Sequence, residues 1–343
     1  MTDGPVTLRE VALRAGVHPS TVSRALDPLR AVHLRAETVR RVTSAAEALG
    51  YEPNPWARNL RTRRSRMVGL VMPRLGDVVL ADIFESAEDR ARERGYQAVT
   101  ASSRDVPTVQ EVLVQRLLDQ RMDGLLLATP RVGDPMLQRL HERGVPFILV
   151  NRTSGDYPSV RGDDELGGYL ATQHLLMRGH RRVGIIVGPL AVSTSAGRLA
   201  GYQRAHNDFG LDVDPALMVE VADFAAQSGA QAAGRLLSRR NAPTALFCVN
   251  DSTAIGAMSV ARDLGLAVPR DLSVVGYNDT AIAALLPVPL TSVSLPLGGM
   301  GKEAVDLLID LIEGGTPDSI LHTPRLIARA SSGGEPAQPP SSD

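Results

Sequence analysis

Residues 8–26 read LREVALRAGVHPSTVSRAL, and this stretch decides what the N-terminal part of the chain is. Apolar side chains recur at three- and four-residue steps over Leu8–Ala15, as one face of a helix requires. Gly16 breaks that pattern. A second short helix is predicted over Pro19–Leu26, where proline is tolerated in the first turn because its missing N–H has no partner there. The stretch therefore predicts two short helices that meet across a tight turn.

A third helix is predicted shortly after this pair. Residues Ala36–Leu49 carry apolar side chains along one face, and Gly50 is suited to the C-cap that ends the helix. Three short amphipathic helices can close a small hydrophobic core together. We therefore expect an all-α head over residues 1–52.

The charge of the chain is unevenly distributed. The first 66 residues hold twelve arginines, no lysine and six acids, a net charge of +6, so the other 277 residues carry −7 within a whole-chain charge of −1. A basic head of this kind suits the phosphate backbone of a nucleic acid. Charge alone leaves a second interpretation open, in which the arginines merely form a solvated basic surface.

Beyond residue 66 the pattern changes to short aliphatic runs that alternate with amphipathic helices. Such alternation predicts parallel sheets built from strand–helix–strand units. The predicted strands are Met67–Met72, Ala98–Ala101, Gly124–Ala128, Phe147–Val150, Val183–Val187, Ala245–Val249 and Ser273–Tyr277. The predicted helices are Leu80–Arg94, Val109–Gln120, Gly167–Arg178, Arg198–Phe209, Ala225–Arg239 and Ser252–Leu264.

Composition narrows the class of protein. A chain of 343 residues is long enough for a small domain and a large one, and it has neither an apolar run of membrane-spanning length nor a secretory signal, which predicts a soluble cytoplasmic protein. The single cysteine, Cys248, is expected to be buried in a strand. Residues 333–343, rich in proline, serine and glycine, are predicted to be a disordered tail.

The stretch from Leu8 to Leu26 closely resembles the helix-turn-helix of the lactose-repressor (LacI) family of bacterial transcriptional regulators. The resemblance implies that the second helix enters the major groove of operator DNA. Arg24 is then placed to pair with both acceptors of a guanine, while hydroxyl side chains contact phosphates. The residues it implies for the head are Thr7, Pro19, Ser20, Thr21, Ser23 and Arg24. His18 and Arg35 depart from the small hydroxyl residues usual at those two helix starts.

Residues 53–66 resemble the hinge and linker of the same family. In that family a short hinge helix enters the minor groove, and an apolar side chain at the position of Leu60 wedges between base pairs. The hinge residues implied to contact DNA are Asn54, Ala57 and Leu60. A helix this short is marginal alone, so we expect its order to depend on DNA. Leu60 as an ordinary linker leucine is the alternative.

The resemblance continues through segments such as Val68–Pro73, Arg198–Tyr202 and Ser273–Asp279, and it implies an effector-binding and dimerisation domain over residues 67–332. The implied fold is an α/β body like the periplasmic sugar-binding proteins: two parallel-sheet subdomains joined by three crossings, with ligand in the cleft between them. We expect the N-subdomain over 67–162 and 292–320, the C-subdomain over 163–291 and 321–332, and crossings near Arg161–Asp163, Thr291–Val293 and Ile320–Thr323.

By the same resemblance, a few positions line the effector cleft: Val79, Arg198, Phe224, Asn250 and Asn278. Arg198 is expected at the opening of a helix, where a guanidinium can give parallel hydrogen bonds to hydroxyls or to a carboxylate. For Asn250–Asp251 and Asn278–Asp279, helix capping after a strand is the alternative, and both roles can coexist.

The expected effector is a small polar metabolite, with a carbohydrate favoured. Two departures from the family weaken the case for a common hexose as the effector. The loop Arg74–Leu80 lacks the aromatic pair on which a sugar ring stacks in many relatives, and Asn278 replaces a frequent aspartate. A nucleobase or an acid stays open as the alternative. The sequence leaves open whether effector releases or promotes DNA binding.

Other classes of function find little support. The chain has no P-loop, no nucleophile elbow and no pair of histidines at zinc-binding helical spacing, so we expect no catalytic residues, no metal and no cofactor. The acids Asp163–Glu165 could suggest a metal, but they match the family's crossing motif. A cytosolic binding protein or enzyme of the same body fold is the alternative function. The family implies a homodimer, in which two heads meet a pseudo-palindromic operator.

Overall fold

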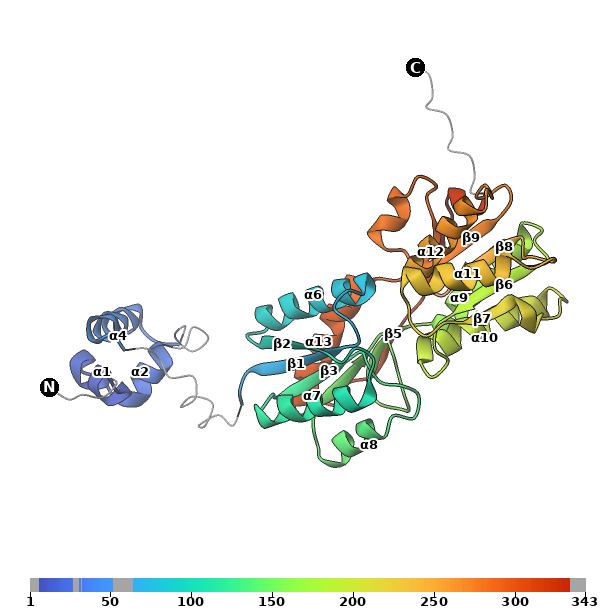
Figure 1. Cartoon of the computed structure of the whole chain (residues 1–343). Coiled ribbons are helices and arrows are strands. Elements are labelled where there is room, and N and C mark those ends of the chain that lie inside the picture. Colours follow the sequence, from blue (N-terminus) through green and yellow to red (C-terminus); the bar gives the residue numbers. More distant parts are fainter. Residues whose placement is uncertain (1–5, 27–30, 32, 52–63, 334–343) are drawn as a thin grey trace, which may run out of the picture. The chain divides into compact units, whose positions relative to one another are not determined.

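The computed structural model describes residues 6–26, 31, 33–51 and 64–333 (Figure 1). The chain divides into two compact units, Met1–Ser65 and Arg66–Asp343, which are described separately below as the head and the body. The predicted hinge contacts Asn54, Ala57 and Leu60 lie outside the described residues, as does most of the predicted tail.

The described part of the head contains three α-helices, α1 (Leu8–Ala15), α2 (Pro19–Ala25) and α4 (Ala36–Leu49). These bounds agree with the predicted helices to within one residue. Gly16 and Gly50 both adopt the left-handed conformation that ends a helix and that glycine enters without steric cost. A small core forms where the three helices meet. Its fully buried centre consists of Val11, Val22 and Val42.

The first half of the body is a six-stranded parallel sheet in the order β11-β5-β4-β3-β1-β2. Its strands are β1 (Met67–Met72), β2 (Gln97–Ser102), β3 (Gly124–Leu127), β4 (Phe147–Val150), β5 (Ser159–Gly162) and β11 (Ile320–His322). Helices α6 (Val78–Glu93) and α13 (Leu297–Glu313) cover one face, and α7 (Pro107–Asp119) and α8 (Pro135–Glu142) cover the other (Figure 1). Because both faces are covered, β3 and β4 are apolar at nearly every position.

The second half repeats this plan in the order β12-β10-β9-β8-β6-β7, where only the edge strand β12 is antiparallel. Its strands are β6 (Val183–Val187), β7 (Met218–Glu220), β8 (Ala245–Cys248), β9 (Ser273–Asn278), β10 (Thr291–Ser294) and β12 (Arg325–Ile327). Helices α9 (Asp164–Met177) and α10 (Ser193–Asp208) cover one face, and α11 (Ala226–Leu237) and α12 (Asp251–Asp263) the other. Short 3₁₀ turns lie at Pro215–Leu217, Ala281–Leu285 and Ala330–Ser332. Cys248 is buried in β8, as predicted.

Three crossings join the two halves, and strand pairing fixes where they lie. The first follows Gly162 at the end of β5, within the predicted segment. The second follows Ser294, because β10 pairs with β9 and β12 and so belongs to the second sheet. The third follows His322, because β11 pairs with β5. The third crossing lies within the predicted segment Ile320–Thr323, whereas the second lies just after the predicted segment Thr291–Val293. The subdomain limits drawn before residue 292 and after residue 320 precede these crossings by three and two residues, since backbone pairing is not visible in composition.

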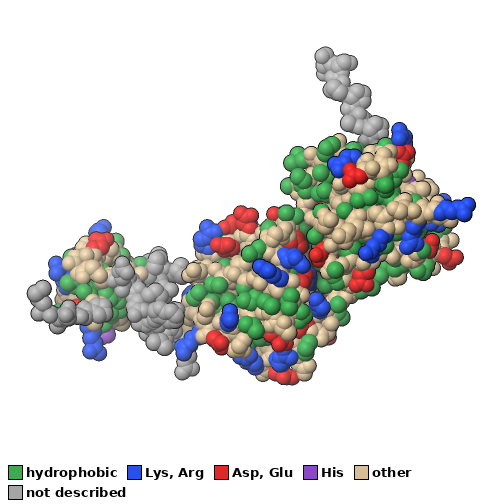
Figure 2. All heavy atoms as spheres, in the orientation of Figure 1, with side chains coloured by type: hydrophobic (Ala, Val, Ile, Leu, Met, Phe, Trp, Pro, Cys, Tyr) green, Lys and Arg blue, Asp and Glu red, His purple; other side chains and the backbone are tan. Residues whose placement is uncertain are grey.

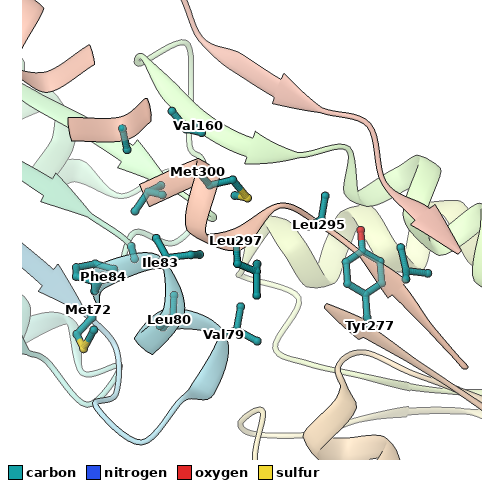
Figure 3. Close-up of a cluster of buried hydrophobic side chains, with 14 of the residues drawn as sticks. Met72, Val79, Leu80, Ile83, Phe84, Val160, Tyr277, Leu295, Leu297 and Met300 are labelled. Atoms are coloured by element: carbon teal, nitrogen blue, oxygen red, sulfur yellow. The ribbon is translucent and has the colours of Figure 1, made fainter. Parts of the chain in front are cut away.

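Side chains from both sheets and from the second crossing meet in one hydrophobic cluster (Figure 3). Leu295 and Leu297, on either side of the proline that precedes α13, lie between Val79 of α6 and Tyr277 of β9 (Figure 3). Leu295 also packs so closely on Gly162 of the first crossing that any side chain there would collide with it. The crossings therefore share a packed apolar surface.

Several elements were not predicted from the sequence. Strands β5, β7, β10, β11 and β12 are three or four residues long, and short strands carry little periodicity. Helix α10 begins at Ser193, five residues before the predicted start, because its first turn is made of small and polar residues. Arg198 is therefore not at the opening of a helix but in its second turn. Within the described residues no helix is both long and apolar enough to cross a membrane.

Glycines allow the paired helices α11 and α12 to approach closely, and two of them in α11 make a matched test. A methyl group at Gly229 would overlap the backbone carbonyl of Thr253 in α12, whereas one at Gly234 would meet nothing within 4 Å. We expect Gly229→Ala to destabilise the protein by about 1–3 kcal/mol, the usual penalty for overpacking. Gly234→Ala should stabilise it by about 0.4–1 kcal/mol, because alanine restricts the unfolded chain.

Urea unfolding of the full chain, followed by circular dichroism, measures both free energies. A shift of the two variants in the same direction would contradict this packing.

Candidate functional site

The N-termini of the first two helices of the head are each held by a side chain. Thr7 and Glu10 form a reciprocal capping box at α1, and the hydrogen bonds from Thr7 lower the pKa of the Glu10 carboxyl. At α2 the cap is His18, whose Nδ1 accepts from the backbone N–H of Ser20 at 3.2 Å and lies 2.8 Å from its hydroxyl. The histidine thus performs the capping role of the usual serine. Arg35 makes no side-chain cap at α4.

The structure places two predicted base contacts on one exposed face of α2. Ser20 and Arg24 are both exposed and lie one helical turn apart, and the Arg24 Nε lies 3.4 Å from the Ser20 carbonyl oxygen. The other predicted residues of this helix, Pro19, Thr21 and Ser23, are half-buried. Helix α2 therefore presents a short polar and cationic face whose direction is fixed by the cap and by the buried Val22.

In the body, all five predicted effector positions line a single cavity: Val79, Arg198, Phe224, Asn250 and Asn278. They come from both halves of the body, Val79 from the first and the others from the second. The cavity volume is about 20 Å³, which is the space of about one water molecule. As the two halves stand in this structure, the cavity is therefore too small to hold a metabolite. Charged side chains of both signs lie along the boundary between the halves (Figure 2).

Arg198 is buried and donates hydrogen bonds to the protein from two of its three nitrogens. Its Nε donates to Asp164 Oδ1 at 2.9 Å, and a terminal nitrogen donates to the Val249 carbonyl at 2.5 Å. The guanidinium carbon lies 3.6 Å from the centre of the Tyr277 ring, a close cation–π contact. Burial raises the pKa of the Asp164 carboxyl, while Arg198 opposes that shift. Arg198 therefore has a structural role at the base of the cleft besides facing the cavity.

The two predicted asparagines differ in how they are used. Asn250 caps α12 through a reciprocal bond with Thr253, and its Nδ2 donates to the Phe224 carbonyl at 3.0 Å. Capping and cavity lining coexist at this residue. Asn278 caps no helix: it is buried with a left-handed φ of 91°, and its Oδ1 accepts no hydrogen bond from any described residue. Its side-chain oxygen therefore keeps an unused capacity to accept a hydrogen bond.

The sequence reasoning missed five lining residues: Asp77, Leu80, Asn151, Arg152 and Thr194. Asn151 and Arg152 follow directly on β4, and Asp77 lies in the loop between β1 and α6. The rule that ligands gather at the carboxyl ends of parallel strands could have found them. Asp77 caps α6 by accepting from the N–H groups of Val79 and Leu80, and burial raises the pKa of its carboxyl.

The acids of the first crossing are each engaged inside the protein. Asp163 caps α9 by accepting from Leu166 N at 2.9 Å, Asp164 pairs with Arg198, and Glu165 pairs with Arg204 at 2.6 Å. They do not converge as metal ligands would. No group of three or more histidines, cysteines or acids placed to hold a metal ion occurs in the part of the chain that the structure describes.

Comparison with known proteins agrees with this architecture. Residues 7–54 match the family model described as bacterial regulatory proteins, lacI family, and residues 172–332 match a periplasmic binding protein-like domain. The chain is 33% identical over 331 residues to the HTH-type transcriptional repressor PurR of Escherichia coli O1:K1, covering 95% of this chain and 96% of PurR.

Solved structures agree over the same length. A complex of the transcriptional regulator CelR with cellobiose is 34% identical with a TM-score of 0.73, covering 95% of this chain and 99% of CelR. A lac repressor dimer bound to operator and the anti-inducer ONPF is 30% identical with a TM-score of 0.84, covering 96% and 99%. This chain is an effector-controlled, DNA-binding transcriptional regulator, and it belongs to the lacI family of bacterial regulatory proteins.

Proposed function

We propose that this protein represses transcription as a homodimer on a pseudo-palindromic operator, and that an uncharged carbohydrate bound in the cleft controls it. The observation that carries the choice of effector is that each arginine of the cavity is already paired with a carboxylate. Arg152 meets Asp105, with N–O distances of 2.7 and 3.1 Å, and Arg198 meets Asp164. Neither guanidinium carries an uncompensated charge for an anion to neutralise.

The remaining lining of the cavity suits a sugar. Amides from Asn151, Asn250 and Asn278 supply donors and acceptors of the kind that hydroxyl groups require, and Asp77 adds a carboxylate acceptor that would repel an anion. Phe224 supplies one aromatic wall, and Val79 and Leu80 lie in the lining as its apolar residues. The CelR structure, which contains cellobiose, supports the same class of effector for a body of this fold.

For the head we propose that α2 reads bases with Pro19, Ser20 and Arg24 and contacts phosphates with Thr21 and Ser23. Thr7, at the exposed start of α1, is a further phosphate contact. The hinge, residues 53–66, contributes Asn54, Ala57 and Leu60 to the minor groove. Domain limits of 1–52 for the head and 67–332 for the effector-binding body follow from this assignment. The protein acts in the bacterial cytoplasm and by binding rather than by catalysis.

The two activities are coupled through the crossings. Opening or closing the cleft changes the angle between the two halves of each body, and in a dimer this alters the spacing of the two hinges. Because the coupling is a free energy shared by both sites, an effector that weakens operator binding is itself bound more weakly by the operator complex. Whether effector weakens or strengthens operator binding depends on whether the operator is bound better with the cleft open or with the cleft closed.

The role of α2 is tested by comparing two exposed arginines of the head, Arg24 in α2 and Arg14 in α1. Selection from a random DNA library defines the operator, and titrations follow on the operator and its single-base variants. We expect Arg24→Ala to reduce discrimination at one base pair of each half-site by about 1–3 kcal/mol, because a bidentate contact to guanine is lost. Arg14→Ala should weaken binding uniformly across sequences.

Equal loss of discrimination in both variants would show that α2 does not read the bases.

The effector class is tested by calorimetry of the full chain with D-glucose, cellobiose, hypoxanthine and gluconate. We expect a neutral sugar to bind and to change operator affinity. Asn278→Ala should weaken that binding about tenfold, because a hydrogen bond to the buried amide contributes on the order of 1–1.5 kcal/mol. Asn207→Ala, at an exposed position of α10, is the matched control and should leave binding unchanged.

Binding of hypoxanthine or gluconate without either sugar would refute a carbohydrate effector.

A further inference from the structure

A second ion pair of the cavity, Arg152–Asp105, spans the carboxyl edge of the first sheet. Arg152 follows β4 and Asp105 follows β2, with β3 and β1 lying between these strands in the sheet. The contact is bidentate, at 2.7 and 3.1 Å, and Arg152 also donates to the Thr129 carbonyl after β3 at 3.3 Å. Only 3% of Arg152 is exposed. The guanidinium therefore lies across the ends of the strands that face the cleft.

The backbone around Asp105 holds the carboxylate in place. Arg104 and Asp105 both have left-handed φ values, 55° and 60°, a conformation that arginine in particular adopts rarely. Arg131 donates to the Asp105 carbonyl at 3.1 Å, and Val106 N donates to the Ser103 carbonyl at 3.1 Å. A loop fixed at both ends in this way presents its carboxylate in one position.

The other side of Arg152 meets the second half of the body. Its guanidinium carbon lies 5.8 Å from the centre of the Phe224 ring, which is a cation–π distance. Two hydrogen bonds join the halves nearby: Thr153 N donates to Ser193 Oγ at 2.9 Å, and Val132 N donates to the Ala191 carbonyl at 2.8 Å. Arg152 thus bridges the cleft through its side chain, while two neighbouring backbone N–H groups donate across it, one to a carbonyl and one to a serine hydroxyl.

The other carboxylate that faces Arg152 is Asp77, which lines the cavity and interacts electrostatically with both Arg152 and Asp105. Without Asp105, a buried guanidinium would have to turn toward Asp77 to stay compensated. The position of Asp105 therefore decides which way Arg152 points.

We propose that Asp105, which does not itself line the cavity, is a positioning residue for the effector site: it holds Arg152 against Phe224 and so joins the two halves of the body at the mouth of the cleft. This inference rests on the proposed function only in taking the cavity as the effector site. The bridge itself can be tested without any effector.

Hydrogen exchange of the full-length protein, read by mass spectrometry, tests the bridge. Asp105→Asn should speed exchange of the segment 221–225, on the opposite side of the cleft, by about fivefold, because a desolvated cation–π contact contributes a factor of that order. The segment 190–193, which the backbone hydrogen bonds hold, should not change. Glu111→Gln is the matched control, because it neutralises the acid of a half-exposed ion pair with Arg139.

Two further variants show whether Asp105 acts through Arg152. Arg152→Gln should loosen 221–225 as much as Asp105→Asn does, and Asp105→Asn should add nothing in the Arg152→Gln background. The double variant, Asp105→Asn with Arg152→Gln, neutralises both partners of the ion pair and so leaves neither charge unpaired. It therefore keeps the test available if Asp105→Asn alone does not fold. Additional loosening in the double variant, or unchanged exchange of 221–225 in Arg152→Gln, would overturn the proposal.

Calorimetry with D-glucose and cellobiose separates this proposal from the effector class. If Asp105→Asn speeds exchange of 221–225 but the natural chain binds neither sugar, the proposed bridge is supported and the carbohydrate effector is refuted. If Asp105→Asn changes neither the sugar affinity nor the exchange of 221–225, the carbohydrate effector is supported and the positioning role of Asp105 is refuted. Where both proposals hold, Asp105→Asn should weaken sugar binding severalfold.

Discussion

The buried guanidinium of Arg198 joins four elements of the body. From α10 it contacts the carboxylate of Asp164 at the start of α9, the carbonyl of Val249 after β8 and the ring of Tyr277 in β9. A buried cation is tolerated only when its charge and its N–H groups are satisfied, so these elements must keep their relative positions. Arg198 also lines the cavity between the two halves. The same constraint gives Arg198 two inseparable roles, and removing its side chain would leave Asp164 as an unpaired buried acid.

Close backbone contacts hold the rest of the body to the same geometry. Gly168 and Gly201 bring α9 and α10 together so closely that a methyl group on either would overlap backbone of the other helix. Gly301 does the same between α13 and α6 in the first half. Within each half, closely packed helix pairs cover the sheet. Contacts this close resist movement inside a half, whereas the two halves are joined to each other by three chain crossings.

Much of the molecule could be predicted from local pattern. In the head, helix bounds follow from apolar periodicity and from Gly16 and Gly50, which mark helix ends through backbone sterics alone. In the body, the long aliphatic strands were clear because burial on both faces makes every position apolar. Strands such as β10 and β11 were not predicted, since three or four residues show no period and their sheet membership depends on partners far along the chain. The start of α10 was missed because Ser193 and its neighbours lack an apolar stripe.

The sequence by itself determined the fold class and the family, because these depend on residue types at fixed spacing along the chain, and the family resemblance in turn implied five positions that line the cavity. Tertiary structure alone decided how those residues are used. It placed Asn250 in a cap and left the Asn278 amide oxygen without a partner among the described residues. It also brought Asp105 and Arg152, 47 residues apart, into one bidentate pair across the ends of four strands. Such pairings arise from sheet order, which no local pattern encodes, and they set the charge that lines the cavity.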